Sequence, residues 1–434
     1  MYTAVKAAWA LLMSMGLLML GNGLQGSLIG LRATLEGFST QFAGVLMSGY
    51  FVGFLLGSTL TPRVVSQVGH VRVFAALASL ASTVVLLHPV FVDPTLWFVM
   101  RVISGFCMAG LYIVAESWLN DLATNKTRGQ LLSLYMVIMI GGMASGQLLL
   151  NVADPGGFKL FILISVLLSF ALLPVLLSVA PAPSFASPTP MGLRQLYLSS
   201  PLGVTGCMAV GLSNGAVVGM GVIYAELIGF PLADISIFMG LILLGSVVLQ
   251  WPIGHLSDKY DRRWVILAVT LLAAVMALAA VPAAQISANA LLVVAFLFGG
   301  LSFPMYSLCV SHTNDNLEPK QMVSASSSLV LAVGLGAALG PSTAAAVMGL
   351  IGPNGLFWFL AVVHAGVGVF ALYRMTRRAA VPLEDQGHCV AIPPAASPVA
   401  MAMVQEASGG HAQGQADEAG VAEPAAAGAV ESKV

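Results

Sequence analysis

The chain has 434 residues, of which 58% are hydrophobic and only 8% are charged, and its mean hydropathy is +0.93. Soluble domains carry about 25% charged residues, so most of this protein's surface must face lipid rather than water. The net charge of −1 gives no basic excess of the kind that nucleic-acid binding needs, and the four cysteines stand singly, which argues against a disulfide framework or a metal cluster.

Twelve apolar runs are long enough, at roughly 20 residues, to cross a bilayer as helices. The first is longer than the apolar core of a signal peptide, so we interpret it as a membrane span rather than a cleaved leader. In chain order the runs are 7–31, 41–61, 71–90, 95–117, 129–151, 158–180, 201–228, 234–256, 263–283, 288–311, 321–346 and 354–374. The pattern predicts an all-α membrane protein with twelve transmembrane helices.

Composition divides the chain into four parts. Residues 1–180 form the first six-helix half, and the Pro/Ser-rich residues 181–200 form a cytoplasmic linker, because proline interrupts helices. Residues 201–376 form the second half. Residues 377–434 are rich in Ala, Gly, Glu and Gln without hydrophobic periodicity, which predicts a disordered cytoplasmic tail.

The distribution of lysine and arginine predicts the orientation of the helices, since cytoplasmic loops are enriched in both. With the N-terminus inside, the inner side holds thirteen basic residues and the outer loops hold two, Arg32 and Lys159. The inner set is Lys6, Arg63, Arg72, Lys126, Arg128, Arg194, Lys259, Arg262, Arg263, Lys320, Arg374, Arg377 and Arg378. We therefore expect a multi-pass protein of the cell (inner) membrane with both termini in the cytoplasm.

An internal repeat indicates that the two halves are equivalent. Asn120-Asp121 recurs as Asn314-Asp315, Lys126 as Lys320, Gly142 as Gly336 and Gly146 as Gly340, each pair 194 residues apart. Both copies lie at spans that start on the same side, so the repeats are parallel, related by an axis along the membrane normal. The glycines form Gly-x-x-x-Gly pairs, which let helices approach closely, whether for static packing or for sliding.

These features resemble the Major Facilitator Superfamily of secondary transporters. The stretch from Trp251 to Arg263 resembles the family's loop motif, with Asp261 where a second glycine is usual. Its matching positions are Gly254, Asp258, Lys259, Arg262 and Arg263. The first-half loop keeps Gly69 and Arg72 but has Ser66 in place of the acid. Arg101, Gly105 and Gly110 match a second family motif, and Glu116-Ser117-Trp118-Leu119-Asn120 followed by Arg128-Gly129 is similar to a poorly characterised bacterial branch.

The resemblance implies a twelve-helix fold and a gating role for the loop motif. Asp258 is expected to face the N-terminus of helix 5, near Arg128, because the free N–H groups of a helix start attract an anion. The alternative is that Lys259 and its basic neighbours only hold the loop on the inner side. We call the first interpretation the cytoplasmic latch.

Polar residues inside apolar spans are candidates for a substrate cavity. Arg101 is the one basic residue well inside a span, and such charges usually face a cavity or a partner. The candidates are Asn22, Gln25, Arg101, Gln147 and Asn214. The alternatives are that Arg101 extends to the outer interface and that the polar side chains only bond neighbouring helices.

Ionisable groups suggest little proton chemistry. Glu116 lies at the inner end of helix 4, where we expect it to support the loop, and His364 is expected to be a neutral packing residue rather than a proton relay. No carboxylate lies near a span centre, which counts against an acid-based coupling mechanism without excluding it. The sparse polar lining favours a neutral or weakly amphipathic solute.

The sequence therefore predicts a secondary active transporter working by alternating access. We expect a monomer that uses a small-molecule substrate and the lipid bilayer as partners, with no cofactor, no metal and no catalytic residue. Proton-coupled efflux and uptake both stay open. The alternative is a transporter-like sensor or scaffold that binds a solute without moving it.

Overall fold

The computed structural model describes residues 2–124, 127–177, 191–392, 397 and 399–401, and within that part of the chain it contains helices and no strand. The membrane-length elements of the first half are α1 (Tyr2–Leu35), α2 (Thr40–Val68), α3 (His70–Leu87), α4 (Pro94–Leu122), α5 (Arg128–Leu148) extended by η1 (Leu149–Val152), and α6 (Lys159–Phe170) followed by α7 (Leu172–Leu176). Those of the second half are α9 (Pro201–Leu227), α10 (Leu232–Lys259), α11 (Arg262–Ile286), α12 (Ala288–Ser302) followed by α13 (Met305–Asn314), α14 (Pro319–Ile351) and α15 (Gly355–Met375). These elements give twelve candidate membrane spans.

Two spans predicted as single helices are broken in the structure. The sixth breaks at Ala171, three residues before Pro174, and the tenth breaks at Phe303–Pro304. Proline has no N–H to donate and its ring clashes with the preceding turn, so a helix kinks or ends there. The fourth and eleventh helices run several residues beyond their predicted ends, to Leu122 and Ile351.

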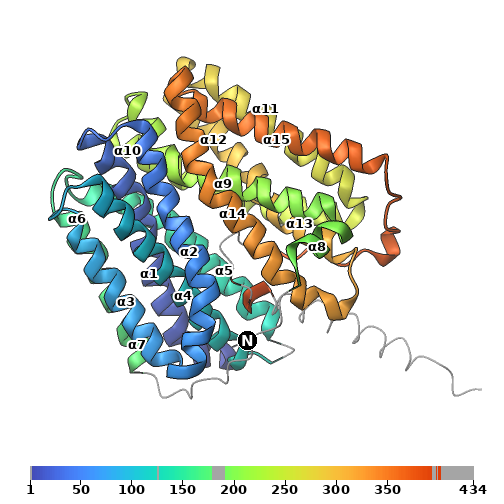
Figure 1. The fold of residues 1–434 in the computed structure, drawn as a ribbon, viewed down its shortest axis with the longest axis horizontal. Helices are drawn as coiled ribbons and strands as arrows, with labels where there is room; N and C mark the ends of the chain where they lie inside the picture. Colours follow the sequence, from blue (N-terminus) through green and yellow to red (C-terminus); the bar gives the residue numbers. More distant parts are fainter. Residues whose placement is uncertain (1, 125–126, 178–190, 393–396, 398, 402–434) are drawn as a thin grey trace, which may run out of the picture.

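The helices form two groups that repeat the same packing (Figure 1). In the first group α5 packs on α1, and in the second α14 packs on α9. A Cβ added at Gly146 would lie 2.4 Å from the Leu20 carbonyl oxygen, and one added at Gly340 would lie 2.3 Å from that of Leu212. The predicted fold of two parallel six-helix repeats is confirmed. All four glycines of the predicted pairs, Gly142, Gly146, Gly336 and Gly340, pack within their own half.

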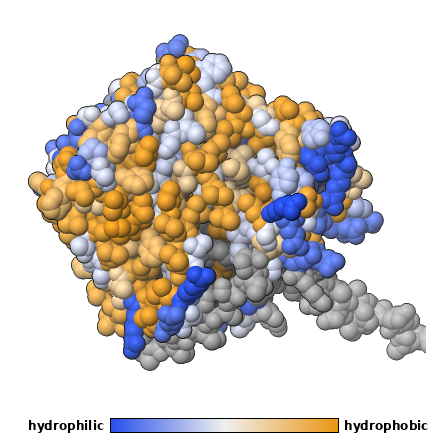
Figure 2. Space-filling model, viewed as in Figure 1, coloured by the Kyte–Doolittle hydropathy of each residue, from blue (hydrophilic) through white to orange (hydrophobic). Residues whose placement is uncertain are grey.

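The exterior is suited to lipid. Large apolar side chains lie exposed around both halves, including Leu148, Val248 and Val275 at 53%, 50% and 52% exposure. Figure 2 shows apolar residues across most of the visible face, with hydrophilic residues gathered near its ends. The protein is therefore a multi-pass membrane protein.

The bundle has two chemically different ends. The end at which α1 and α9 begin carries Arg63, Arg72, Lys259 and Arg263, and we call it the basic end. The opposite end carries Arg32 and Lys159. Lys126, residues 181–190 of the predicted linker and residues 402–434 of the predicted tail lie outside the described residues. The described part of the linker contains a short helix, α8 (Leu193–Ser199), whose Leu196 is fully buried.

Candidate functional site

The two halves meet toward the opposite end, where two seams carry hydrogen bonds. On the first seam, between α2 and α14, the Ser48 and Ser342 hydroxyl oxygens lie 2.7 Å apart. On the second, between the end of α5 and α10, the Asn151 amide donates to the Ser236 hydroxyl over 2.6 Å. Gly44 brings α2 against α14 so closely that an added Cβ would lie 2.3 Å from the Ala345 Cβ. The opposite end is closed by small and neutral side chains.

A polar cluster lies between α1, α2 and α4, and we call it the arginine–tyrosine cluster. The Arg101 guanidinium lies over the Tyr50 ring, 4.7 Å from its centroid. Tyr50 donates its hydroxyl to the Asn22 side-chain oxygen, and the Asn22 amide donates to the Tyr112 hydroxyl, both over 3.3 Å. Arg101 is only 4% exposed, and its Nε has no hydrogen-bond partner among the described residues. A Cβ added at Gly26, one turn from Asn22 on the same face of α1, would meet no atom within 4 Å, so the cluster borders open space.

The other predicted cavity residues bond neighbouring helices. The Gln25 amide donates to the Ser104 hydroxyl over 3.3 Å, joining α1 to α4. Gln147 of α5 accepts from Ser27 and donates to the Gly23 carbonyl oxygen, so it joins α5 to α1. The structure brings Asn22 and Arg101 into one cluster, with Gln25 beside them on α1.

Asn214 lies in the second half, apart from that cluster. Its side-chain oxygen accepts from the Ser302 hydroxyl over 3.1 Å, and Ser302 also contacts the His364 Nε2 at 3.1 Å. The His364 Nδ1 lies 3.2 Å from the Thr270 hydroxyl, and the ring is 2% exposed. His364 thus links α15 with α11 and α12 through hydroxyl groups.

Glu116 is fully buried, on α4 about 9 Å from the helix end at the basic side. One carboxylate oxygen accepts from the Tyr135 hydroxyl of α5 over 3.0 Å. The other accepts from the backbone N–H of Ser397, over 3.1 Å. The carboxylate therefore contacts another helix of its own half and a segment that follows α15 in the chain. These contacts differ from the loop-supporting role expected for Glu116 from the sequence.

The loop motif forms a group of charges around Arg262, the first residue of α11. Arg262 is 1% exposed, pairs with Asp315 and donates to the Ser257 hydroxyl over 2.8 Å. Burial raises the pKa of Asp315 even though the adjacent Arg262 lowers it. Asp258 lies 3.9 Å from Arg262 and accepts from the Cys389 N–H over 2.7 Å. The contact predicted between Asp258 and the start of α5 stays a prediction.

Asp261, at the motif position where glycine is usual, has a structural role at the start of α11. It is the N-cap of α11, and its carboxylate accepts from the Arg263 backbone N–H over 3.0 Å. The Arg263 guanidinium donates to the same carboxylate over 2.8 Å. Burial raises the pKa of Asp261, but the hydrogen bonds and charge of Arg263 outweigh it and hold that pKa below its usual range. Lys259 is exposed, and Gly254 borders open space.

The first-half loop is built differently. Gly69 has φ +91°, a conformation that favours glycine, and this turn allows α3 to follow α2 directly. His70 is the first residue of α3, as Arg262 is of α11, and its Nε2 lies 3.0 Å from the Ser117 hydroxyl. Ser66 donates to the Arg63 carbonyl oxygen over 2.8 Å, and Arg72 is exposed. Among the described residues of the two loops, a buried arginine paired with an acid occurs at the second-half loop only.

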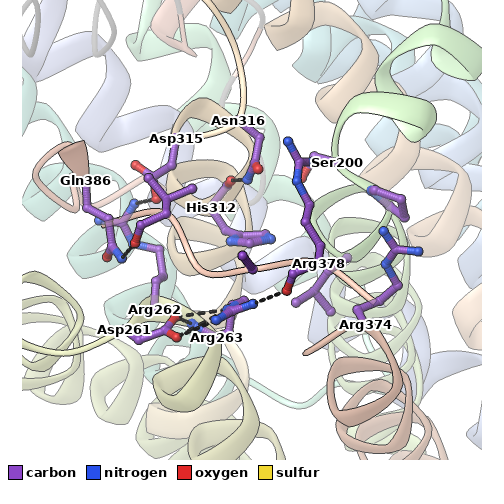
Figure 3. A pocket seen from close by; sticks show the side chains of 14 residues that line it. Ser200, Asp261, Arg262, Arg263, His312, Asp315, Asn316, Arg374, Arg378 and Gln386 are labelled. Carbon is purple, nitrogen blue, oxygen red and sulfur yellow. Dashed lines mark hydrogen bonds and ion pairs between the residues drawn. The ribbon is translucent and has the colours of Figure 1, made fainter. Parts of the chain in front are cut away.

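A polar pocket lies beside the loop motif at the basic end of the second half (Figure 3). Figure 3 shows Arg263 between the Asp261 carboxylate and the Arg378 carbonyl oxygen, which accepts over 2.8 Å. The remaining polar lining is Ser200, Arg262, His312, Asp315, Asn316, Arg374 and Gln386. This pocket opens within one half, so it is separate from the arginine–tyrosine cluster. Arg262 and Arg263 are already engaged there by acids and carbonyl groups.

Sequence reasoning missed the tyrosines and one acid. Tyr50 and Tyr112 complete the arginine–tyrosine cluster, while Tyr306 of α13 faces the basic end of the gap between the halves, near Glu116. Tyr112 and Tyr306 share the 194-residue offset of the internal repeat, which was a readable signal. Asp315 also belonged to that repeat but was not assigned a role. Across the described residues no group of three or more His, Cys, Asp or Glu side chains is arranged to hold a metal ion.

A helical membrane protein with two repeated six-helix halves and a polar cluster between helices is typical of a secondary transporter. The Major Facilitator Superfamily model matches residues 11–249 and 202–401, and the chain belongs to that family. The family points to a transporter rather than an enzyme.

Relatives and solved structures agree with this assignment. The chain is 28% identical over 369 residues to the "Uncharacterized MFS-type transporter YcaD" of Escherichia coli O45:K1, covering 84% of this chain and 94% of YcaD. It is similar in fold to the nucleoside transporter NupG, with a TM-score of 0.71, 13% identity and coverage of 86% of this chain and 98% of NupG. A bacterial homolog of the human lysosomal transporter Spinster, in an inward-facing and occupied conformation, has a TM-score of 0.70, 15% identity and coverage of 89% and 98%.

Proposed function

We propose that the protein is a secondary carrier that moves a small solute by rocking its two halves, and that this structure is the conformation open at the basic end. The observation that carries the proposal is the asymmetry of the contacts between the halves. Toward the opposite end α2 contacts α14, and Asn151 contacts Ser236 directly. Near the basic end, Glu116 and Ser307 of different halves both bond to a segment of chain that lies between them.

The orientation completes the proposal. Lysine and arginine gather at the basic end, which by the positive-inside rule is cytoplasmic. The conformation is then inward-facing. The similar Spinster homolog is described in an inward-facing conformation, which supports this interpretation.

The arginine–tyrosine cluster is the substrate site that we favour. Arg101 presents a buried donor without a partner, and such a donor gains about 1–3 kcal/mol when a ligand supplies an acceptor. Tyr50 adds an aromatic face, and Gly26 leaves room beside Asn22. A small neutral or weakly amphipathic solute with an acceptor oxygen or nitrogen suits this lining. NupG is a nucleoside transporter, so nucleosides belong in the first panel of trial substrates.

Glu116 is the acid that we assign to proton coupling. Among the described membrane spans it is the only fully buried carboxylate, and membrane-buried carboxylates are common in proton relays. Tyr135 belongs to the same half as Glu116, whereas Ser397 belongs to the segment that also bonds to Ser307 of the other half. Protonation of Glu116 therefore affects the Ser397 contact, which changes when the halves rock.

A cross-link across the first seam tests the carrier. Ser48→Cys with Ser342→Cys, in a Cys389→Ser background, places two thiols where the hydroxyl oxygens lie 2.7 Å apart. A thermal-shift screen of nucleosides, sugars and organic anions first identifies a ligand, whose flux is then measured in proteoliposomes. Oxidation should stop flux and a reducing agent should restore it, while each single-cysteine variant stays active. Flux that continues after complete cross-linking would contradict alternating access.

The sensor alternative also has an observation in its favour, because Ser397, beyond the last helix, contacts Glu116 inside the bundle. A sensor would bind the ligand without moving it. Binding by thermal shift together with zero flux in proteoliposomes would therefore select the sensor over the carrier.

A further inference from the structure

The described residues that follow η2 (Leu383–Asp385) fold back into the bundle, and we call residues 387–392, 397 and 399–401 the C-terminal segment. Ile392 is 4% exposed, Ser397 1% and Met401 0%. Figure 1 shows the short red turn of residues 399–401 between the two groups of helices. Such burial differs from the disordered tail expected from composition.

The segment is first anchored on the charges of the loop motif. Arg262 donates to the Gly387 carbonyl oxygen over 2.6 Å, and the Gly387 N–H donates to Asp315 over 3.1 Å. The Cys389 N–H donates to Asp258 over 2.7 Å. The acid that the family pattern assigns to gating is thus bonded to the backbone of the C-terminal segment.

The second anchor is Ser307 of α13. Its hydroxyl accepts from the Ile392 N–H over 2.9 Å and donates to the Ile392 carbonyl oxygen over 3.2 Å. Ser307 is fully buried. One side chain therefore satisfies both backbone groups of Ile392, which fixes the position of the segment on the second half.

The third anchor lies on the other half. The Ser397 N–H donates to Glu116, and the Ser397 hydroxyl accepts from the Val399 N–H over 3.1 Å. Ser397 thereby begins a turn of helix, and the free N–H groups at such a start favour a nearby carboxylate. The Met401 sulfur, within the same turn, accepts from the Tyr306 hydroxyl of the second half over 3.6 Å.

We propose that the C-terminal segment is an intramolecular plug that occupies the gap between the halves at the basic end and keeps this end open. The inference rests on the proposed rocking of the halves. Because the segment bonds to Glu116 on one side and to Ser307 and Asp258 on the other, these surfaces meet only after it leaves. Its departure also frees Asp258 for the latch with α5. The segment consequently inhibits turnover by stabilising one conformation.

The native thiol of Cys389 reports whether the segment is docked. Cys107, Cys207 and Cys309 are buried within the helices. Burial raises the pKa of the Cys389 thiol, so its thiolate is scarce and reaction with maleimide is slow. In the full-length protein in nanodiscs, Ile392→Asp and Met401→Asp should speed labelling of Cys389 by about tenfold or more, since each places a charge in a buried apolar site. Ala391→Asp is the matched control, because Ala391 is exposed, and it should leave the rate unchanged.

A second reporter tests control of the conformation. Ser236 is 1% exposed because it lies in the seam with Asn151. A cysteine at this position becomes accessible to maleimide only when the opposite end opens. In a Cys389→Ser background, Ile392→Asp should raise its labelling about fivefold or more, while Ala391→Asp should not.

Two results would overturn the plug. The first is fast labelling of Cys389 in the native protein, unchanged by Ile392→Asp, which shows an undocked segment. The second is that Ile392→Asp speeds the labelling of Cys389 but leaves the labelling of Ser236→Cys unchanged. The segment would then dock in the native protein without controlling the conformation. Neither result touches the carrier itself. The carrier fails separately, if the Ser48–Ser342 cross-link leaves flux intact.

Discussion

Gly44→Ala is expected to shift the protein toward the conformation open at the opposite end. The added methyl group would lie 2.3 Å from the Ala345 Cβ and 2.8 Å from the Pro341 carbonyl oxygen, both on α14 in the other half. Overpacking of this kind costs typically 1–3 kcal/mol. The cost applies only while α2 and α14 touch, so the equilibrium between the two conformations should change by about 5- to 150-fold.

The reporter for this shift is placed on the other seam, so that a local distortion around Gly44 is not mistaken for opening. Ser236→Cys lies between α10 and the end of α5, and its labelling by a membrane-impermeant maleimide follows the opening of the halves as rigid bodies. Gly366→Ala is the matched control, because a Cβ there meets no atom within 4 Å. Labelling of Ser236→Cys that is equal in the Gly44→Ala and Gly366→Ala proteins would refute the reasoning.

Three further outcomes are expected. Asp315→Asn should lower the free energy of unfolding by about 3 kcal/mol in detergent denaturation, because the buried Arg262 keeps only the more distant Asp258 as an acid. Asp121→Asn, at the exposed repeat-equivalent position, should cost about 0.5 kcal/mol or less. Asp261→Asn, which keeps an N-cap residue but loses the charge, should lower the Tm at pH 7. Its difference from the native protein should disappear as the pH falls below the usual range of an aspartate and through the lowered pKa of Asp261, since the carboxylate contributes stability only while it is ionised. A difference that persists at low pH would contradict this. Tyr50→Leu should weaken binding of the screened ligand about tenfold, because it removes the aromatic face and the hydrogen bond to Asn22. Tyr197→Leu, at an exposed site, is the control. Equal ligand affinity in the two variants would exclude the arginine–tyrosine cluster as the substrate site.

The sequence predicted the fold because membrane spans and repeats are local or periodic signals. Apolar length identified twelve helices, and the 194-residue offset predicted that Gly146 and Gly340 occupy equivalent places, which they do against Leu20 and Leu212. The breaks near Pro174 and Pro304 could not be read from residue type alone, because Pro62, Pro252, Pro282 and Pro341 lie inside helices that continue through them.

The site was less predictable because its partners are distant in sequence. Arg101 was recognisable as a buried charge, but its partner Tyr50 lies on another helix, and tyrosine in an apolar span is common packing material. Glu116 was misjudged because depth along a helix says nothing about which neighbours cover it. The C-terminal segment had no apolar periodicity, since it is held by backbone hydrogen bonds to Asp258, Ser307 and Glu116 that composition does not encode.

The chemistry of the two ends gives them different sensitivities to dissolved salt. The seam at the opposite end is closed by hydroxyl, amide and glycine contacts such as Ser48 with Ser342, on which mobile ions exert little effect. At the basic end Asp258 is partly exposed and lies 3.9 Å from Arg262, so its interactions weaken as the Debye length falls from about 8 Å at 0.15 M to about 3 Å at 1 M salt. For the proposed rocking carrier we therefore expect ionic strength to change the contacts at the basic end and to leave those at the opposite end unchanged.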